Sequence, residues 1–113
     1  MIVRVVTARV RSERAAAFNS ILRQQLPILR EQPGIVYIKL VRQVDTEGEN
    51  VLLFEEWRDT ASLYAWAGPH ITKARLLPGA EELVEHLEVN HYEALDVDFD
   101  EEVVPLPRRV ETS

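Results

Sequence analysis

Residues 54–75 read FEEWRDTASLYAWAGPHITKAR, and this stretch decides the fold. It predicts the end of a strand followed by an interrupted helix. Glu55 and Trp57 lie two residues apart, so they share one face of the strand. Asp59 is a suitable N-cap for the helix, and Gly68–Pro69 interrupts that helix.

Aromatic side chains and one histidine gather at this strand-to-helix corner. Trp57 belongs to the strand, Tyr64 and Trp66 belong to the helix, and His70 follows the interruption. Small-molecule pockets are lined by aromatic groups with a few polar tips, but an ordinary hydrophobic core uses the same residue types. The corner therefore indicates where a site would lie and leaves its chemistry undecided.

The residues before this corner predict a strand, a helix and a hairpin. Residues 2–10 are rich in Val and Ile and predict the first strand. Ser12 is a suitable N-cap for a helix that ends at Pro33–Gly34. Residues 35–44 and 51–58 predict two strands joined by a short polar turn.

The residues after the corner complete the pattern. Residues 60–86 predict a second helical region, which includes a final short helix, and residues 87–97 predict a fourth strand. This order predicts an α+β fold of the ferredoxin-like split βαβ type, with a four-stranded antiparallel sheet and helices on one face. We expect one domain over 1–97 and an acidic, Pro-containing tail over 98–113.

Both faces of the predicted strands are apolar. In the second strand, one set of alternate residues opposes another, namely Val36, Ile38 and Leu40 against Ile35, Tyr37 and Val41. One set packs on the helices, and the other would form an exposed apolar patch unless a partner covered it. We therefore expect a homodimer that packs sheet against sheet.

Composition excludes several classes of function. The chain has 113 residues and 46% apolar content, which suits a single domain. Its net charge of −6 argues against a nucleic-acid partner, and the absence of Cys excludes disulfides and thiolate chemistry. No segment has the length and apolar character of a membrane span, and the N-terminus does not read as a signal peptide. We expect a cytoplasmic protein.

With these elements in place, the chain resembles the antibiotic biosynthesis monooxygenase family of dimeric α/β-barrel proteins. Four segments carry the resemblance: MIVRVVTARV, QPGIVYIKLVR, FEEWRDTASLYAW and GPHITKA. The resemblance implies a cofactor-independent monooxygenase that acts on an aromatic or quinone-like small molecule. In such a reaction the substrate itself, as a phenolate or enolate, reacts with oxygen. The protein binds the ring, favours the deprotonated form and excludes water.

The resemblance also bears on cofactors. Relatives that degrade haem carry an Asn near the end of the first strand, a Trp on the second helix and a haem-ligating His further on. The matching positions here are Thr7, Trp66 and either Arg75 or Leu76. Since neither Arg nor Leu supplies the missing His ligand, we expect no haem, and we expect no other cofactor.

Six side chains are candidates for the site. Histidine as a residue type suits general-base work at neutral pH, so His70 could act as a base or oxyanion partner. For catalysis the candidates are His70, Trp66 and Tyr64, and for substrate binding they are Thr7, Tyr37 and Trp57. Thr7 faces the helices only if Val3 and Val5 do so.

Plainer interpretations stand beside these. Trp and Tyr residues commonly pack cores, and we expect Glu55 to pair with an arginine on a neighbouring strand rather than to act as a base. Alternation places Asn90 on the face opposite to His91 and Glu93, so we expect no metal site. A dimer that binds a small molecule without turnover, or a purely structural dimer, remains an alternative to the enzyme.

Overall fold

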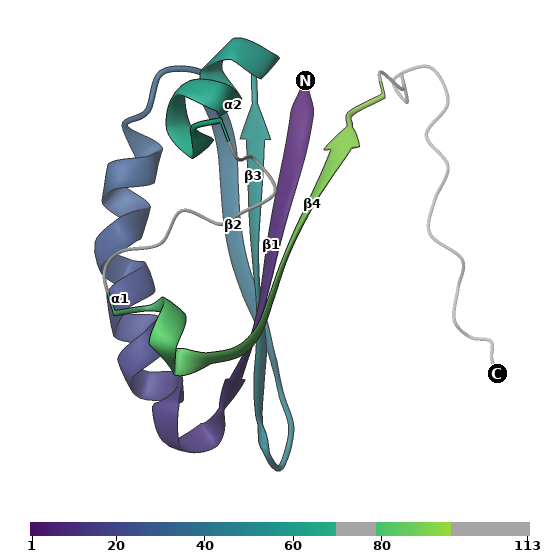
Figure 1. Cartoon of the computed structure of the whole chain (residues 1–113). Coiled ribbons are helices and arrows are strands. Elements are labelled where there is room, and N and C mark those ends of the chain that lie inside the picture. Colours follow the sequence, from purple (N-terminus) through teal and green to yellow (C-terminus); the bar gives the residue numbers. More distant parts are fainter. Residues whose placement is uncertain (70–78, 96–113) are drawn as a thin grey trace, which may run out of the picture.

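A computed structural model describes residues 1–69 and 79–95. The described ranges form a four-stranded antiparallel sheet with both α-helices on the same side of it (Figure 1). In chain order the elements are β1 (Ile2–Arg11), α1 (Ser12–Arg30), β2 (Ile35–Val44), β3 (Gly48–Trp57), α2 (Thr60–Ala67), a 3₁₀ helix (Glu81–Leu83) and β4 (Val84–Glu93). The predicted α+β, ferredoxin-like plan is confirmed.

The first strand of the chain lies inside the sheet. The strand order is β2-β3-β1-β4, so β1 pairs with both β3 and β4, and β2 and β4 form the edges. Arg4 on β1 lies opposite Glu55 on β3 and opposite His91 on β4. The register therefore places three ionisable side chains in one row across the sheet.

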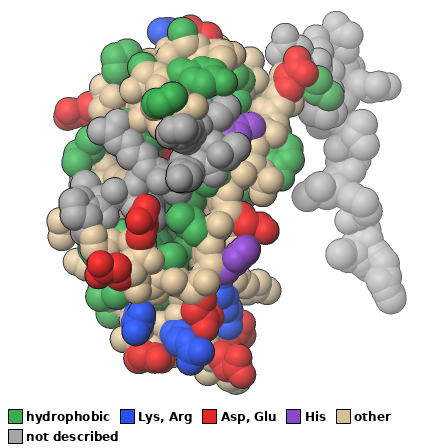
Figure 2. All heavy atoms as spheres, viewed as in Figure 1, with side chains coloured by type: hydrophobic (Ala, Val, Ile, Leu, Met, Phe, Trp, Pro, Cys, Tyr) green, Lys and Arg blue, Asp and Glu red, His purple; other side chains and the backbone are tan. Residues whose placement is uncertain are grey.

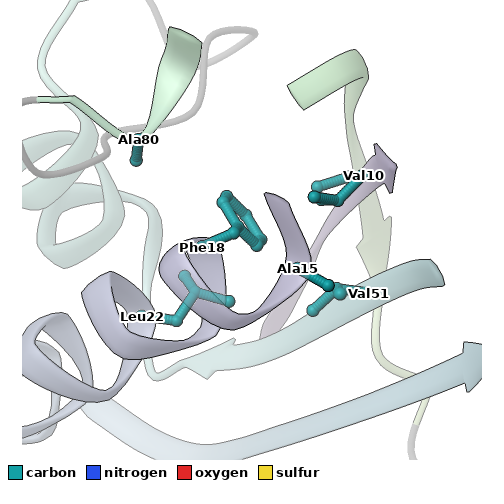
Figure 3. Close-up of a cluster of buried hydrophobic side chains, with 7 residues drawn as sticks. Val10, Ala15, Phe18, Leu22, Val51 and Ala80 are labelled. Atoms are coloured by element: carbon teal, nitrogen blue, oxygen red, sulfur yellow. The ribbon is translucent and has the colours of Figure 1, made fainter. Parts of the chain in front are cut away.

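The hydrophobic core fills the space between the sheet and the helices. Figure 3 shows one cluster, in which Phe18 and Leu22 of α1 meet Val10 of β1 and Val51 of β3. A second cluster lies nearer α2 and consists of Val6, Leu29, Leu53, Trp57, Leu63 and Trp66. In β1 the even-numbered side chains therefore face the helices.

The odd-numbered side chains of β1 point to the other side of the sheet, which we call the open face. The open face is formed by alternate residues from all four strands. They include Val3, Val5, Thr7, Tyr37, Val41, Leu52, Phe54 and Tyr92, together with polar residues such as Lys39, Glu56, Glu88 and Asn90. Tyr37 and Tyr92 are 49% and 55% exposed in the single chain. Both faces of the sheet thus carry large apolar side chains, as the sequence predicts.

The alternation in β2 differs from the prediction. The register with β3 shifts between Ile35 and Tyr37, so that Ile35 lies opposite Trp57 while Tyr37 lies opposite Glu56. Ile35 consequently packs on the same cluster as Ile38, and Val36 is the extra residue of the bulge. A bulge of this kind reverses the alternation, which a strict period of two cannot anticipate.

Two strand boundaries also differ from the prediction. β3 begins at Gly48 rather than Val51, because Gly48 already pairs with Arg11 of β1; the lack of a Cβ at Gly48 permits its close approach to the carbonyl oxygen of Val10. β4 spans Val84–Glu93 rather than 87–97, since Val84 already pairs with Val10 and leaves room only for a 3₁₀ turn before it. The tail predicted over 98–113 lies outside the described residues.

The ends of the helices explain how the chain turns back onto the sheet. The Asp59 side chain accepts a hydrogen bond of 2.8 Å from the backbone N–H of Ser62 and caps α2, as predicted. Gly68 follows α2 with a φ of 77° and ends it. Ser12, predicted as the N-cap of α1, is instead the first residue of that helix, because Arg11 still pairs with Gly48 in the sheet.

Charged side chains gather at one end of the molecule, at the lower end of Figure 2. The Arg9 guanidinium donates two hydrogen bonds, of 2.8 and 3.0 Å, to the Asp45 carboxylate in the β2–β3 turn. Arg11 donates a 2.7 Å hydrogen bond to Glu85 of β4. These exposed ion pairs join the turn to β1 and β4. None of the described helices is long and apolar enough to span a membrane.

Candidate functional site

A buried ion pair lies on the helix side of the sheet. The Nε atom of Arg4 is 3.7 Å from Oε1 of Glu55, and the two side chains are only 1% and 2% exposed. Their strands are neighbours and their Cα positions are in register, so the pairing follows directly from the β1–β3 alignment. The predicted pairing of Glu55 with an arginine is confirmed.

Two stacked tryptophans adjoin this pair. The Trp57 indole N–H donates a 3.0 Å hydrogen bond to the same oxygen, Oε1 of Glu55. The ring of Trp66 lies 6.5 Å from that of Trp57, centroid to centroid, with an interplanar angle of 27°. The capped start of α2 explains the contact, because it directs the buried face of the helix, Leu63 and Trp66, back onto the end of β3.

His91 completes the row on the opposite side of Arg4. Its Nε2 lies 3.1 Å from Nη1 of Arg4. A guanidinium only donates hydrogen bonds, so Nε2 accepts and the proton of the neutral imidazole resides on Nδ1. Burial, together with the charge of Arg4, lowers the pKa of His91 and keeps the ring neutral at physiological pH.

The electrostatics of the row are dominated by burial. Burial raises the pKa of Glu55, although the hydrogen bond from Trp57 and the charge of Arg4 both oppose the change. Burial also lowers the pKa of Arg4, which Glu55 counteracts, and a guanidinium remains charged throughout the physiological range. The row thus combines a buried cation, a partnered carboxylate and a neutral histidine beside an aromatic wall.

The structure brings together some of the six predicted site residues. Trp57 and Trp66 are in contact, while Tyr64 of α2 is 44% exposed. His70 lies outside the described residues. Thr7 and Tyr37 belong to the open face and are separated from the tryptophans by the sheet.

The position of Thr7 settles its comparison with haem-degrading proteins. The condition that Val3 and Val5 face the helices is not met, since the even-numbered residues of β1 do so. Val6, one residue earlier, is buried in the cluster with Trp66, and Ile2 of the same strand also packs against this cluster. Thr7 therefore does not lie beside Trp66 on the helix side.

Tyr37 lines a separate pocket on the open face. The pocket has a volume of about 280 Å³ and is formed by Val3, Tyr37, Lys39, Phe54, Glu55 and Glu56. Its surface is largely apolar; Lys39 and Glu56 have their side chains on this face, whereas the Glu55 carboxylate lies on the helix side. This pocket and the tryptophan pair lie on opposite sides of the sheet.

Two members of the helix-side row, Arg4 and His91, were not predicted as site residues. Alternation puts Arg4 on the same face as Val6 and Val10, but both faces of β1 are apolar, so the sequence did not indicate that this face points inward. For His91, no local signal exists, since its contact with Arg4 depends on the pairing of β1 with β4. The described residues contain no group of three side chains placed to hold a metal ion.

Comparison with solved structures places the fold. A candidate antibiotic biosynthesis monooxygenase of Deinococcus radiodurans aligns with a TM-score of 0.68 at 20% identity, covering 87% of this chain and 96% of its own. Rv0793 of Mycobacterium tuberculosis gives a TM-score of 0.69 at 22% identity, with 85% and 96% covered. PA3566 of Pseudomonas aeruginosa gives 0.65 at 19% identity, with 84% and 94% covered. These proteins share the ferredoxin-like α+β fold.

The family follows from the sequence comparison. The sequence profile of the antibiotic biosynthesis monooxygenase family matches residues 1–75, which include β1, α1, β2, β3 and α2. The chain belongs to this family. Among curated proteins, none matches the chain significantly.

Proposed function

We propose that this protein is a cofactor-independent monooxygenase that acts, as a homodimer, on an aromatic or quinone-like small molecule. The observation that carries the proposal is the stacked Trp57–Trp66 pair, which adjoins the buried row of Arg4, Glu55 and His91. An aromatic wall beside a few fixed polar groups is the composition of a small-molecule site. Membership of the monooxygenase family supports the type of reaction.

The proposed reaction converts an aromatic CH₂ group, activated by a neighbouring ketone or phenol, to a carbonyl. Loss of one proton gives an enolate, which transfers one electron to O₂, and the resulting radical pair combines to form a C–O bond. Loss of water from the hydroperoxide breaks the O–O bond and the remaining C–H bond. In total, R₂CH₂ and O₂ give R₂C=O and H₂O, so the substrate supplies all four electrons.

In this proposal the chain supplies binding, orientation and a proton acceptor. Trp66 and Trp57 stack on the ring system, and Tyr64 lies on the same helix as Trp66. His70 follows that helix by three residues and is proposed to accept the proton and to stabilise the enolate oxygen. Fixed dipoles and exclusion of water favour the deprotonated substrate.

The proposed homodimer covers the open face. In the single chain this face carries partly exposed Tyr37, Val41 and Tyr92 together with Leu52 and Phe54. Contiguous apolar surface of this kind is typical of protein–protein interfaces. In the dimer, Thr7 and Tyr37 would line the space between the two sheets. They would contact a ligand bound in that space, but not one bound at the tryptophans on the helix side. The cytoplasmic location remains a prediction.

Oxygen uptake tests the proposal. The protein is incubated with a panel of polycyclic phenols and anthrones, and oxygen consumption is measured together with the mass of the product. Trp66→Ala should weaken substrate binding, and it should also cost about 3–5 kcal/mol of stability because the ring is packed in the core. His70→Ala should lower turnover by roughly 100-fold with little change in stability.

The two variants also discriminate against a purely structural role. If His70 serves only the fold, His70→Ala keeps its rate and loses melting temperature. Full activity of His70→Ala would remove that residue from the site. Absence of oxygen uptake with every substrate that binds would contradict the proposed reaction.

One observation favours a second candidate, a protein that binds an aromatic molecule without turnover. Glu55 is held by both Arg4 and Trp57, so the only carboxylate of the row is not available as a strong base. In that case a ligand would bind with the same affinity in the presence and absence of oxygen, and it would be recovered unchanged.

A further inference from the structure

The two sides of the Arg4 guanidinium differ. Towards β3, its Nε faces Glu55, which is 2% exposed and also holds the Trp57 indole. Towards β4, its Nη1 contacts Nε2 of His91, a residue that is only partly buried and lies on an edge strand. The Glu55 side is therefore closed within the core, whereas the His91 side borders the surface.

We propose that Arg4 is an oxyanion-binding residue, that His91 is a displaceable acceptor for its Nη1 donor, and that the site selects aromatic ligands with an ionised oxygen on the ring. The inference deepens the proposed function, since it names the substrate group that the helix-side site recognises. It concerns binding, so it holds equally for an enzyme and for a protein that binds without turnover.

Charge favours the exchange of His91 for a ligand oxygen. In the single chain, the Nη1 donor of Arg4 meets a neutral nitrogen acceptor. A phenolate or enolate oxygen at the same place would form a charge-assisted hydrogen bond, which is shorter and about twice as strong as a neutral one. A buried setting strengthens this difference, because the local dielectric is low. A neutral ketone oxygen gains no such advantage over the histidine.

Geometry links this donor to the aromatic wall. One oxygen atom, Oε1 of Glu55, lies 3.0 Å from the Trp57 indole nitrogen and 3.7 Å from Nε of Arg4. The carboxylate therefore fixes the guanidinium and the tryptophan relative to each other. Because the two groups are held close together, we expect a ligand that stacks near the tryptophans while bonding Arg4 to carry its oxygen directly on the ring system, as a hydroxyquinone or an acidic phenol does.

Intrinsic fluorescence provides the test, because Trp57 and Trp66 are the two tryptophans of the chain and both belong to the site. The protein is titrated with 2-hydroxy-1,4-naphthoquinone, which is ionised at neutral pH, and with 1,4-naphthoquinone, which is not. The chain has no Cys, so thiol adducts do not interfere. We expect the ionised quinone to bind at least about tenfold more tightly, the ratio that one charge-assisted bond supports.

Two variants assign the preference to the row. Arg4→Met/Glu55→Gln removes both buried charges together, and the Trp57 indole N–H keeps a hydrogen-bond acceptor. Since no cation remains, the ratio of the affinity for the ionised quinone to the affinity for the neutral quinone should fall to about one. In His91→Ala the competing acceptor is gone, so the ionised quinone should bind about threefold or more tightly, while the neutral quinone is unaffected. The matched control, Arg9→Met, removes an arginine of β1 that pairs with Asp45 and should leave the ratio unchanged.

Each outcome decides the inference. A ratio near one in the unaltered protein, a ratio that persists in Arg4→Met/Glu55→Gln, or no binding of the ionised quinone up to about 1 mM overturns it. If the double variant does not fold, His91→Ala decides, because weaker binding of the ionised quinone there contradicts a displaceable acceptor. A selective protein without oxygen uptake would refute the proposed reaction and leave this inference standing.

Discussion

Removal of either partner of the Arg4–Glu55 pair should destabilise the protein far more than removal of both. Arg4→Met leaves the Glu55 carboxylate buried without its cation, and Glu55→Gln leaves the guanidinium buried without its anion. Breaking a buried pair in this way costs about 3–5 kcal/mol. The double variant removes both charges, and the amide oxygen that Glu55→Gln introduces can still accept the Trp57 hydrogen bond.

The coupling between the two residues can be worked out from their separation. At 3.7 Å and an effective dielectric constant of about 20, Coulomb's law gives an attraction of about 4.5 kcal/mol. Desolvation of both ions offsets most of this attraction in the folded protein, so the pair adds little net stability. The coupling energy nevertheless reports the attraction between the two charges. Each single variant loses this attraction, and the ion that remains is still desolvated. We expect a coupling energy of about 2–4 kcal/mol.

This coupling energy is measured by urea denaturation at neutral pH, followed by far-ultraviolet circular dichroism. The four proteins compared are the unaltered protein, the two single variants and the double variant. All four proteins must unfold with the same dependence on denaturant for the comparison to hold. The reasoning is refuted if the changes in unfolding free energy of the two single variants add up, within about 0.5 kcal/mol, to the change in the double variant. It would mean that the two charges do not depend on each other in the folded state.

Three further predictions concern the turn before β2, His91 and the open face. Gly34 has a φ of 88°, and a Cβ there would collide with Ser62 of α2. In chemical denaturation, Gly34→Ala should therefore lower the free energy of unfolding by at least about 1 kcal/mol more than Gly79→Ala, because Gly79 has a φ of 90° but no atom within 4 Å of an added Cβ. Equal losses of stability in the two variants would show that the collision with Ser62 has no effect. Because the pKa of His91 is lowered in the folded chain, the unfolded state binds more protons below the ordinary histidine pKa of about 6.5, and stability should fall as the pH drops through this range. His91→Gln should flatten that part of the stability profile, and an unchanged slope in His91→Gln would contradict a neutral His91. Leu52→Glu places a charge in the proposed interface, so it should convert the dimer into monomer or unfold the protein, as measured by light scattering. The control Gln24→Glu, on the exposed side of α1, should leave the mass unchanged. A monomeric unaltered protein at micromolar concentration would exclude the dimer.

Much of the fold could be predicted because its signals are local. The Pro33–Gly34 pair lies between the end of α1 at Arg30 and the start of β2, the Asp59 cap begins α2, and Gly68 ends it, so the element order follows from local signals. The bulge at Ile35 and the early start of β4 could not be predicted, because both depend on which residues face them across the sheet.

The candidate site could be predicted only where its residues are near each other in sequence. Trp57, Glu55 and Trp66 lie within one strand-to-helix corner, and their contacts were within reach of pattern analysis. The side on which Thr7 lies could be predicted only conditionally, because both faces of β1 are apolar and alternation leaves the inward face undecided. The contact of Arg4 with His91 spans 87 residues and depends on strand register alone.

The place of β1 in the sheet has a consequence for synthesis. Among the described strands of the sheet, β1 is the first to leave the ribosome, yet its neighbour on one side is β4, the last of them. Until residue 93 has emerged, the nascent chain can form only a partial sheet in which the apolar β1 is an edge with unpaired backbone groups. Such an edge is a template for pairing with other chains. Completion of β4 therefore protects each newly made molecule from aggregation, and a chain cut short after α2 loses that protection.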